Sequence, residues 1–294
     1  MELNDFNKKR EEYAEEFENY ARVYFSRKFD TEQTLFEAMK YSFFAGGKRV
    51  RPVLMLAAAD FFGAPKDRVM PYALALECIH TYSLIHDDLP AMDNDDYRRG
   101  KLTNHKVFGE AIAVLAGDAL LNLAFSIAAE EATRHSDKAS CECMRFLADY
   151  AGFEGMIGGQ AADVLSEISK SKNEDLLYFI EKNKTAKLLT LPFLLPCILA
   201  CGDRDLAINI GLKVGVQFQI IDDILDVESS LAVLGKSVGK DAESDKLTFV
   251  NLFGVKRAKE RAEQLYAEVA DLLSGYENSG FLLAYAKALK DRIF

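Results

Sequence analysis

The chain has 294 residues, of which 49% are hydrophobic and 28% charged, and its 36 basic and 46 acidic residues give a net charge of -10. This composition is ordinary for a globular protein and excludes extensive disorder. The length allows one or two domains with a large core. The acidic balance excludes nonspecific binding of nucleic acid, which needs a basic surface.

The start of the chain and its apolar runs predict a cytoplasmic protein with no membrane span. The first twenty residues are acidic, unlike an Arg-rich transit peptide, and they contain no apolar signal core. The longest apolar run, "LLTLPFLLPCILACG", is shorter than a membrane span and contains Pro192 and Pro196, so we interpret it as a buried helix. Five cysteines lack zinc-type spacing and are assigned no chemistry.

Helical periodicity dominates from the N-terminus onward. Apolar residues recur at helical spacing in the first two segments, at Phe6, Tyr13, Phe17, Tyr20, Tyr24, Leu35, Met39 and Phe43. Helix breakers follow at Asp30-Thr31, Gly46-Gly47, Gly63 to Pro65, Gly158-Gly159, Gly202-Asp203 and Gly275. Strand patterns are scarce and no flexible linker divides the chain. We therefore predict about ten helices, several of about 20 residues or longer, in one all-α domain over residues 1–294.

The segment "GGKRVRP" predicts an anion site at the start of a helix. Gly46 and Gly47 free the backbone, Lys48 and Arg51 supply positive charge, and Pro52 marks the first turn, whose free N–H groups also favour an anion. A loop of this kind is weak evidence when it stands alone.

The next segment, "ECIH", allows a rival metal site. Glu77-x-x-His80 is the spacing that di-iron carboxylate bundles use, but such a site needs a second copy. None of His86, His105 and His135 has a glutamate three residues before it, which argues against this site. On spacing alone, His80 is equally consistent with a core histidine and with a place near the following aspartates.

The first acidic box, "HDDLPAMDNDDYRRG", gathers Asp87, Asp88, Asp93, Asp95 and Asp96 within ten positions. Crowded carboxylates repel one another, so a cation is expected among them. Asp87 and Asp93 would lie on different faces of an unbroken helix. Pro90 disrupts the helix and lets the chain bulge, which can bring Asp93 back toward Asp87. Arg98 and Arg99 follow directly.

The second acidic box, "FQIIDDILD", lies on a helix because its apolar neighbours keep the helical period through the aspartates. Asp222 and Asp226 are four residues apart and share a face, with Asp223 beside them. Such a pair suits Mg²⁺, which takes one or two carboxylates together with phosphate and water. Lys236, Lys240 and Lys246 follow this box. Lys184-Thr185 in "NKTAKL" is weaker evidence, because such a pair is usually only surface.

The alternative for each acidic box is a solvated helix end. Two features favour a binding site. Both boxes follow strongly apolar stretches, which places them at the inner end of a buried helix, and both are followed by cations. Metal ions with guanidinium and ammonium groups are how a protein holds a diphosphate.

With these motifs in this order, together with "GGQAADV" and "LGKSVGKD", the sequence resembles the short-chain isoprenyl diphosphate synthases of the bacterial farnesyl diphosphate synthase type. The resemblance extends from about residue 30 to the end. It implies mostly antiparallel helices around a deep central cavity, with the two boxes facing each other across its mouth. It also implies a homodimer. Leu102 stands where the family commonly has proline, and we expect this departure to loosen that loop without removing a charged group.

The resemblance also implies a role for each motif residue. The metal ligands would be Asp87, Asp88, Asp93, Asp222 and Asp226, with two or three Mg²⁺ ions per site and Mn²⁺ as a substitute. The allylic diphosphate would be held by Arg98, Lys184, Thr185, Gln219, Lys236 and Lys246. Isopentenyl diphosphate would be bound by Gly47, Lys48, Arg51, His80 and Arg99. The catalytic set implied is Asp87, Asp88, Asp93, Arg98, Arg99, Lys184, Asp222, Asp223 and Lys236.

The implied activity is a head-to-tail condensation of isopentenyl diphosphate with dimethylallyl or geranyl diphosphate. It needs no protein nucleophile, which agrees with the lack of a recognisable Ser/His/Asp or Cys/His set. Tyr82, about one and a half turns before Asp87, and Ser83 would set the product length. An aromatic residue at this position resembles the farnesyl-forming enzymes.

Three alternatives remain open at this point. A geranylgeranyl diphosphate synthase would differ in the depth of the cavity around Tyr82. A noncatalytic regulatory subunit would keep the fold and tolerate the loss of Asp87 or Asp222. A terpene cyclase could dispense with "GGKRVRP" and with one acidic box, so the presence of all three motifs argues against it.

Overall fold

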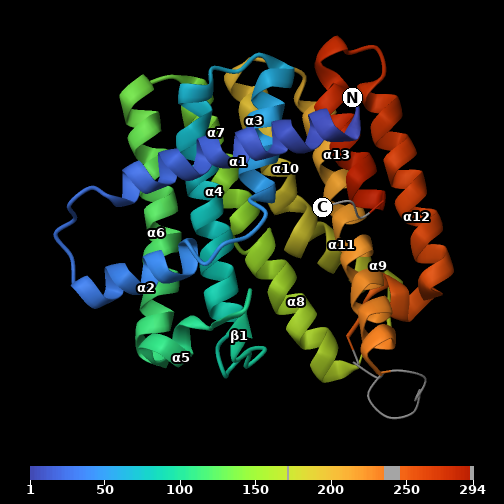
Figure 1. The fold of residues 1–294 in the computed structure, drawn as a ribbon, viewed down its shortest axis with the longest axis horizontal. Helices are drawn as coiled ribbons and strands as arrows, with labels where there is room; N and C mark the ends of the chain where they lie inside the picture. The colour runs from blue at the N-terminus through green and yellow to red at the C-terminus, as the bar shows by residue number, and fades with distance from the viewer. Residues whose placement is uncertain (171, 235–245, 292–294) are drawn as a thin grey trace. The chain divides into compact units, whose positions relative to one another are not determined.

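The computed structural model of the chain describes residues 1–170, 172–234 and 246–291. Over these residues its regular secondary structure is helical apart from one short hairpin, which confirms the all-α prediction (Figure 1). The chain forms two compact units. The first consists of Asn7–Leu147 and Ile198–Gly202, and the second of Met1–Phe6, Ala148–Cys197 and Asp203–Phe294. The prediction of a single domain over residues 1–294 stays a prediction.

The elements from the N-terminus to the middle of the chain are α1 (Leu3–Phe25), α2 (Gln33–Phe43), α3 (Val50–Phe62), α4 (Lys66–Asp87), β1 (Tyr97–Arg98), β2 (Lys101–Leu102), α5 (Asn104–Phe108), α6 (Glu110–His135) and α7 (Lys138–Ala151). The elements that follow are α8 (Met156–Ser169), α9 (Glu174–Ile180), the π-helix η1 (Glu181–Ala186), α10 (Lys187–Leu199), α11 (Arg204–Leu234), α12 (Phe249–Leu273), the 3₁₀ helix η2 (Glu277–Ser279) and α13 (Gly280–Asp291). Several of these helices exceed 20 residues, as predicted.

The first unit is built around α4, which is buried from Val69 to Ile79 because that stretch is almost continuously apolar. α4 and α6 lie side by side (Figure 1). Half of the α6 residues buried in the core are alanine, and Gly117 is another, and these small residues let two helix backbones approach closely. The buried middle of α4 gives the first acidic box a fixed starting point.

The core of the second unit lies between α11, α12 and the η1 segment. Ile220, Ile221 and Ile224 of α11 pack with Leu265 of α12 and with Ile180, directly before η1. α10 is the buried helix predicted from the apolar run. These contacts fix the segments that carry "NKTAKL" and the second acidic box.

Three sequence expectations were wrong in detail. Gly158-Gly159 does not break a helix but lies inside α8, because Gly159 faces the backbone of Lys184 and has no room for a side chain there. The second acidic box lies within α11, which continues to Leu234, rather than at a helix end. A short antiparallel hairpin, with Tyr97 opposite Leu102, was not expected, since two-residue strands leave no periodic signal.

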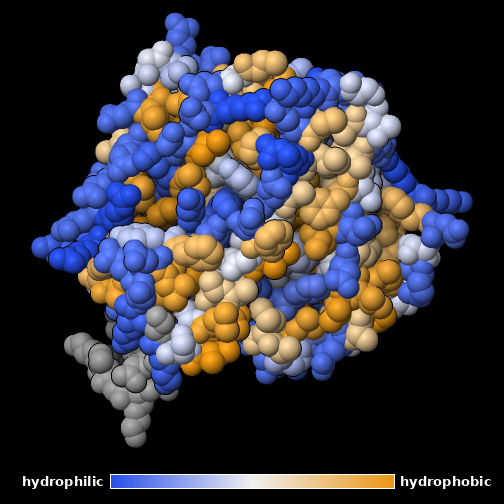
Figure 2. Space-filling model, turned by 180° about the vertical axis from the view of Figure 1, so that it is seen from behind, coloured by the Kyte–Doolittle hydropathy of each residue, from blue (hydrophilic) through white to orange (hydrophobic). Residues whose placement is uncertain are grey.

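Among the described residues, one helix is long and apolar enough to cross a membrane by length and composition, namely Glu110–His135, with 39% of its apolar window buried. A single such helix is weak evidence for a membrane span, because the core helices of soluble proteins have the same length and composition. Exposed large apolar residues on this helix include Val114 and Leu115. On the face that Figure 2 presents, apolar side chains are exposed between polar ones.

Candidate functional site

The first acidic box begins where α4 ends. α4 stops at Asp87, and Asp88 caps it by donating its N–H to the Leu84 carbonyl at 3.1 Å. The chain then turns back, so that the N–H of Asp93 donates to the carbonyl of Asp87 at 2.9 Å. The return of Asp93 toward Asp87 that Pro90 predicts is thus confirmed for the backbone.

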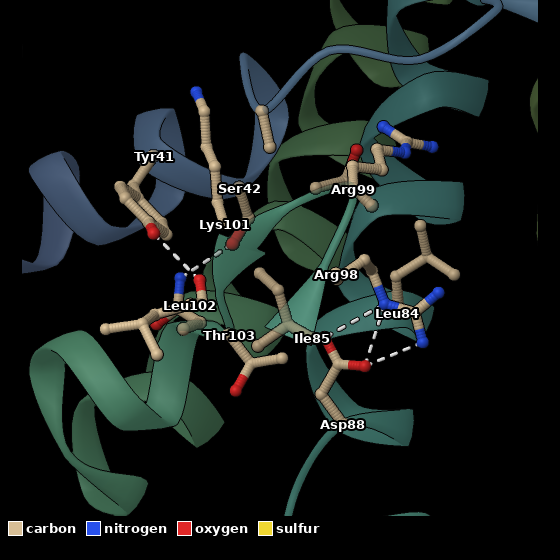
Figure 3. A pocket seen from close by; sticks show the side chains of 13 residues that line it. Tyr41, Ser42, Leu84, Ile85, Asp88, Arg98, Arg99, Lys101, Leu102 and Thr103 are labelled. Atoms are coloured by element: carbon tan, nitrogen blue, oxygen red, sulfur yellow. Dashed lines mark hydrogen bonds and ion pairs between the residues drawn. The ribbon is translucent and has the colours of Figure 1, made fainter. Parts of the chain in front are cut away.

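Asp88 faces inward and binds an arginine. Its side chain is 5% exposed, and its Oδ1 accepts from Nε of Arg98 at 2.7 Å and pairs with Nη2 at 2.6 Å, as Figure 3 shows. Its Oδ2 lies 3.0 Å from the same Nε. Burial raises the pKa of Asp88, while the Arg98 guanidinium acts to lower it. The sequence placed Asp88 and Arg98 in one site, and the structure makes them a bidentate pair.

A hairpin delivers the two arginines of this box. Arg99 (φ 54°) and Gly100 (φ 75°) form its turn, and both have the positive φ that tight two-residue turns require. The carbonyl of Leu102 accepts from the Tyr41 hydroxyl at 2.7 Å, which ties β2 to α2 (Figure 3). A cavity of about 30 Å³, the space of roughly one water molecule, lies beneath the hairpin. This cavity is too small for a substrate. The contacts around it, such as that between Tyr41 and Leu102, hold the hairpin in place.

Arg99 joins the acidic box to "GGKRVRP". Its guanidinium donates to the carbonyl of Gly46 and lies against Gly47, where a Cβ would collide with it. Arg99 is thereby placed beside the segment that carries Lys48 and Arg51. The resemblance assigns all three residues to the binding site of isopentenyl diphosphate, which requires them to lie close together. Pro52 lies in the first turn of α3, as predicted.

His80 lies within the field of these cations. Burial lowers the pKa of His80 well below 6.5, and Arg51, Arg99, Arg98 and Arg49 lower it further. The imidazole is therefore neutral at pH 7, when one ring nitrogen carries a proton and can donate a hydrogen bond. The structure places His80 close enough to these basic groups to feel their charge, and its role in the site stays a prediction.

Tyr82 and His86 form the next layer along α4. Tyr82 is 5% exposed, and its ring meets the His86 ring edge to face with centroids 5.6 Å apart. Burial and the nearby Asp87 raise the pKa of Tyr82 to about 12, so the phenol is neutral. His86 in turn lies 3.0 Å from the Val114 carbonyl and occupies the space that a side chain at Gly117 would need. Ser83 donates to the carbonyl of His80 at 3.0 Å.

In the second unit, a chain of hydrogen bonds connects "NKTAKL" to the second acidic box. Thr185 donates to Oε1 of Gln219 at 2.8 Å, and Nε2 of Gln219 donates to Oδ1 of Asp223 at 2.9 Å. Oδ2 of Asp223 accepts from the N–H of Phe249, the first residue of α12, at 3.1 Å. Burial raises the pKa of Asp223 to about 6, although both hydrogen bonds favour its charged form.

Thr185 is buried, so the surface interpretation of Lys184-Thr185 was wrong for the threonine. Both residues lie on η1, a π-helical stretch of a kind often found at functional sites. Lys184 forms an ion pair with Asp163 of α8. Lys246 lies 3.5 Å from Glu167 of the same helix. Lys236 and Lys240 lie outside the described residues.

Asp222 and Asp226 are exposed on α11, one turn apart, while Asp223 is turned inward. No three or more His, Cys, Asp or Glu side chains over the described ranges are gathered to hold a metal by themselves. Mg²⁺ commonly takes only one or two carboxylates and completes its shell with phosphate oxygens and water. The hard oxygen donors of Asp222 and Asp226, and of Asp87 and Asp93, fit an ion of this kind.

The sequence analysis missed Glu181. It lies on η1, three residues before Lys184, is 3% exposed, and neither carboxyl oxygen has a hydrogen-bond partner. Burial and the nearby Asp223 raise the pKa of Glu181 to about 8, despite the opposing effect of Arg261. The available signal was its spacing of four residues, about one helical turn, from Leu177, which is a buried core residue.

The two acidic boxes lie in different units, so their facing each other across a central cavity stays a prediction. Each box combines exposed carboxylates with an inward-facing aspartate that is bound by a basic or amide side chain. Cationic groups lie directly beside the first box, at Arg98 and Arg99, and on the η1 segment that is hydrogen-bonded to the second. This arrangement suits an anion that is held by metal ions and cations together.

Comparison with known proteins identifies the family. The polyprenyl synthetase family matches residues 32–274. The chain is 47% identical over 250 residues to the heterodimeric geranylgeranyl pyrophosphate synthase large subunit 1, chloroplastic, of Arabidopsis thaliana, covering 82% of this chain and 67% of that protein. It is 44% identical over 266 residues to the farnesyl diphosphate synthase of Bacillus subtilis, covering 88% of each.

A solved structure is similar over nearly the whole chain. It is the geranyltransferase from Helicobacter pylori complexed with magnesium and isoprenyl diphosphate. The two chains are 31% identical, with a TM-score of 0.80 over 99% of this chain and 97% of that one. The motifs, the all-α fold and these similarities agree: the chain belongs to the polyprenyl synthetase family and is a prenyltransferase.

Proposed function

We propose that the chain condenses isopentenyl diphosphate with dimethylallyl or geranyl diphosphate to give mainly farnesyl diphosphate. The observation that carries the reaction is the hairpin that places Arg98 on Asp88 and Arg99 on the Gly46-Gly47 segment. One short element thereby joins the carboxylate box to the basic segment. Two diphosphates, one at each, would lie next to each other.

The proposed roles combine this geometry with the family resemblance, and Lys236, which lies outside the described residues, is assigned from the resemblance alone. Lys48, Arg51, Arg99 and the neutral His80 bind the diphosphate of isopentenyl diphosphate. Arg98, Lys184, Thr185, Gln219, Lys236 and Lys246 hold the allylic diphosphate. Asp87, Asp93, Asp222 and Asp226 hold Mg²⁺, two or three ions per site, which when bound would neutralise charge on the allylic diphosphate and its leaving group. The Mg²⁺ complex of the Helicobacter pylori geranyltransferase supports this assignment.

The chemistry would be a substitution at the allylic C1. The C1–O bond breaks and its electron pair leaves with diphosphate, the double bond of isopentenyl diphosphate attacks C1, and a proton then leaves the new chain to the departed diphosphate. The basic groups stabilise the leaving group at the place where its negative charge develops. No protein base is needed beside the double bond, because the departed diphosphate accepts the proton.

The product length rests on Tyr82. The phenol is buried and neutral and packs against His86, which is itself fixed over Gly117. A ring held in this way about one and a half turns below Asp87 would stop the growing chain at fifteen carbons. Geranylgeranyl diphosphate synthase is the alternative, and relatives of both kinds are similarly close in identity.

We also propose a homodimer formed through α6. Val114 and Leu115 of α6 and Val107 of the adjacent α5 are exposed by 41–51%. Exposed apolar side chains on neighbouring elements favour association. The cytoplasmic location stays a prediction, since the plant relative is named as chloroplastic.

The reaction is tested by incubating purified protein with Mg²⁺, isopentenyl diphosphate and geranyl or dimethylallyl diphosphate, then separating the dephosphorylated products. A dominant C15 alcohol is expected. A C20 alcohol would keep the chemistry and favour the geranylgeranyl alternative. No product from folded protein with either primer would contradict the proposed function and favour a noncatalytic subunit. The double variant Asp87→Ala with Asp222→Ala, which removes a carboxylate from each acidic box, is the negative control for contaminating synthase.

A further inference from the structure

Arg49 is buried within the basic segment, whereas its neighbour Lys48 is exposed. Its side chain is 2% exposed, and each nitrogen of the guanidinium has a different partner. Nε donates to Oε1 of Glu18 at 2.6 Å, Nη1 donates to Oε1 of Glu77 at 2.9 Å, and Nη2 donates to the carbonyl of Phe43 at 2.8 Å. An arginine is rarely this buried unless it is paired on all sides.

The partners of Arg49 belong to three different helices. Glu18 lies on α1, Phe43 ends α2, and Glu77 lies on α4, three residues before His80. The Glu77 side chain is 3% exposed, so this ion pair is shielded from solvent on both sides. Glu77 is the glutamate of the "ECIH" pattern. The structure gives it a function unrelated to a di-iron site, namely to bind Arg49.

The backbone of this segment needs such an anchor. Gly46, Gly47 and Arg49 have positive φ values of 94°, 131° and 48°. For arginine this left-handed conformation is unfavourable by about 1 kcal/mol and persists only where surrounding contacts hold it. Arg49 is also the N-cap residue of α3, so its position sets where the first turn, with Arg51, begins. Lys48 and Arg51 therefore depend on the Arg49 contacts for their positions.

Glu77 also provides charge compensation. Its carboxylate acts to raise the pKa of Arg49 and of Arg99, and burial acts to lower both. For Arg49 the carboxylates prevail and the pKa is raised. The pKa of Arg99 is lowered, because the effect of burial is larger than that of the Glu77 carboxylate. The positive charges of Arg49 and Arg98 lower it further. A buried carboxylate beside this group of cations reduces their mutual repulsion and keeps them close together when no substrate is bound.

We propose that Arg49 and Glu77 are a positioning pair that holds the Gly46–Arg51 segment, and with it Arg99, in the geometry that binds the diphosphate of isopentenyl diphosphate. This inference rests on the proposed function. Neither residue touches the substrate. Both act through Lys48, Arg51 and Arg99, which gives the pair a kinetic signature that a merely stabilising ion pair lacks.

The first test is the Arg49→Lys variant, which keeps the charge but cannot reproduce the three-way fork. Misplacement of binding groups by about 1 Å can cost about 100-fold. The KM for isopentenyl diphosphate should rise about tenfold or more, while the KM for geranyl diphosphate and kcat stay within about threefold. Glu77→Gln, which keeps the shape and removes the charge, should shift the same KM in the same direction by a smaller factor.

The matched control is Arg68→Lys. Arg68 lies on the same helix as Glu77, and its Nη2 binds Asp137 at 2.6 Å and Ser140 at 2.8 Å. It lies twelve residues before His80, about 18 Å along the helix axis. Its replacement should lower the melting temperature without changing the KM for isopentenyl diphosphate. Melting curves of every variant, followed by circular dichroism, establish the folded fraction at the assay temperature.

If Arg49→Lys does not fold, the double variant Arg49→Met with Glu77→Met carries the same prediction, because it leaves neither member of the pair as an unpaired buried charge. Unchanged KM values in a folded variant, or an equal loss in the affinity for both substrates, would overturn the inference. Titration calorimetry with isopentenyl diphosphate alone measures its affinity directly. A weaker affinity in the folded variant supports a positioning pair, and an unchanged affinity supports an ion pair that only stabilises the fold. Wild-type protein that yields no product contradicts the proposed function, whereas active protein with unshifted affinity in the variants contradicts only the positioning pair.

Discussion

The Asp88 carboxylate is paired with the Arg98 guanidinium through Nε at 2.7 Å and Nη2 at 2.6 Å, and 5% of its side chain is exposed. This pair orients Arg98 toward the acidic box and occupies the oxygens that a metal ion would use. The sequence analysis placed Asp88 among the metal ligands. The geometry favours a positioning role through Arg98.

This role predicts a difference between two neighbouring aspartates. Asp88→Asn should raise the KM for the allylic diphosphate by about tenfold to 100-fold, because a hydrogen-bonded charge of this kind contributes about 1.5–3 kcal/mol. The Mg²⁺ concentration for half-maximal activity should stay the same. Asp87→Asn should raise that concentration. Initial rates measured against Mg²⁺ check both, and an equal Mg²⁺ requirement in the two variants would place Asp88 back among the ligands.

Tyr82 is predicted to limit the product. Tyr82→Ala should shift the main product from C15 to C20 or longer, because it removes a buried ring that packs on His86. The change should also destabilise the protein by about 3–5 kcal/mol, as expected for deleting a buried aromatic side chain. Tyr82→Phe keeps the ring and should keep the C15 product. Chromatography of dephosphorylated products decides, and an unchanged chain length for the alanine variant removes Tyr82 from the explanation.

Glu181 predicts a pH dependence of stability. Its pKa of about 8 in the folded protein lies above the value of 4.5 expected when unfolded. The folded state therefore binds this proton more tightly. The contribution to stability is complete below pH 4.5 and is lost as pH rises toward and through 8.

Glu181→Gln should abolish this loss, so the variant should melt at a higher temperature than wild type at pH 8, by on the order of several degrees. The difference should be small at pH 5. Scanning calorimetry in EDTA at the two pH values measures it without bound metal. A difference between variant and wild type that does not grow with pH would mean that Glu181 is not held protonated.

Gly159 predicts a packing requirement between α8 and η1. A side chain there would overlap the backbone of Lys184, so Gly159→Ala must push the two elements apart. We expect a loss of about 1–3 kcal/mol in the free energy of unfolding and weaker binding of the allylic diphosphate. Gly280→Ala is the control, since nothing lies within 4 Å of its Cβ position. Urea unfolding of both variants measures the difference, and equal stabilities would contradict the close approach.

The α6 surface predicts the oligomeric state. Leu115 is 51% exposed, and Leu115→Glu should convert a dimer into monomers by placing a charge in an apolar interface. Light scattering after size exclusion measures the mass directly. The exposed Leu165 of α8 provides the control, since Leu165→Glu should leave the dimer intact. A monomeric wild-type protein would contradict the proposal.

Much of the architecture is encoded locally. Helical periodicity through "FQIIDDILD" placed Asp222 and Asp226 on one face, and the structure leaves both exposed one turn apart. Even the inward position of Asp223 had a signal, because it lies three residues after the fully buried Ile220. The position of Pro90 predicted that the chain turns back after α4, and the backbone of Asp93 does return to that of Asp87. These features depend on residues close in sequence, and bond geometry and steric exclusion act at that range.

The sequence by itself determined the helical class, the two acidic boxes, the basic segments and their chemistry. The tertiary structure decided which charged groups are buried and what they bind. Arg49 and Arg51 are close in sequence and chemically identical, yet Arg49 is buried and binds groups on three helices, whereas Arg51 is half-buried. The partners Glu18 and Glu77 lie 31 and 28 residues away. Only long-range packing brings such groups together, and a charge is buried only where packing supplies its partner.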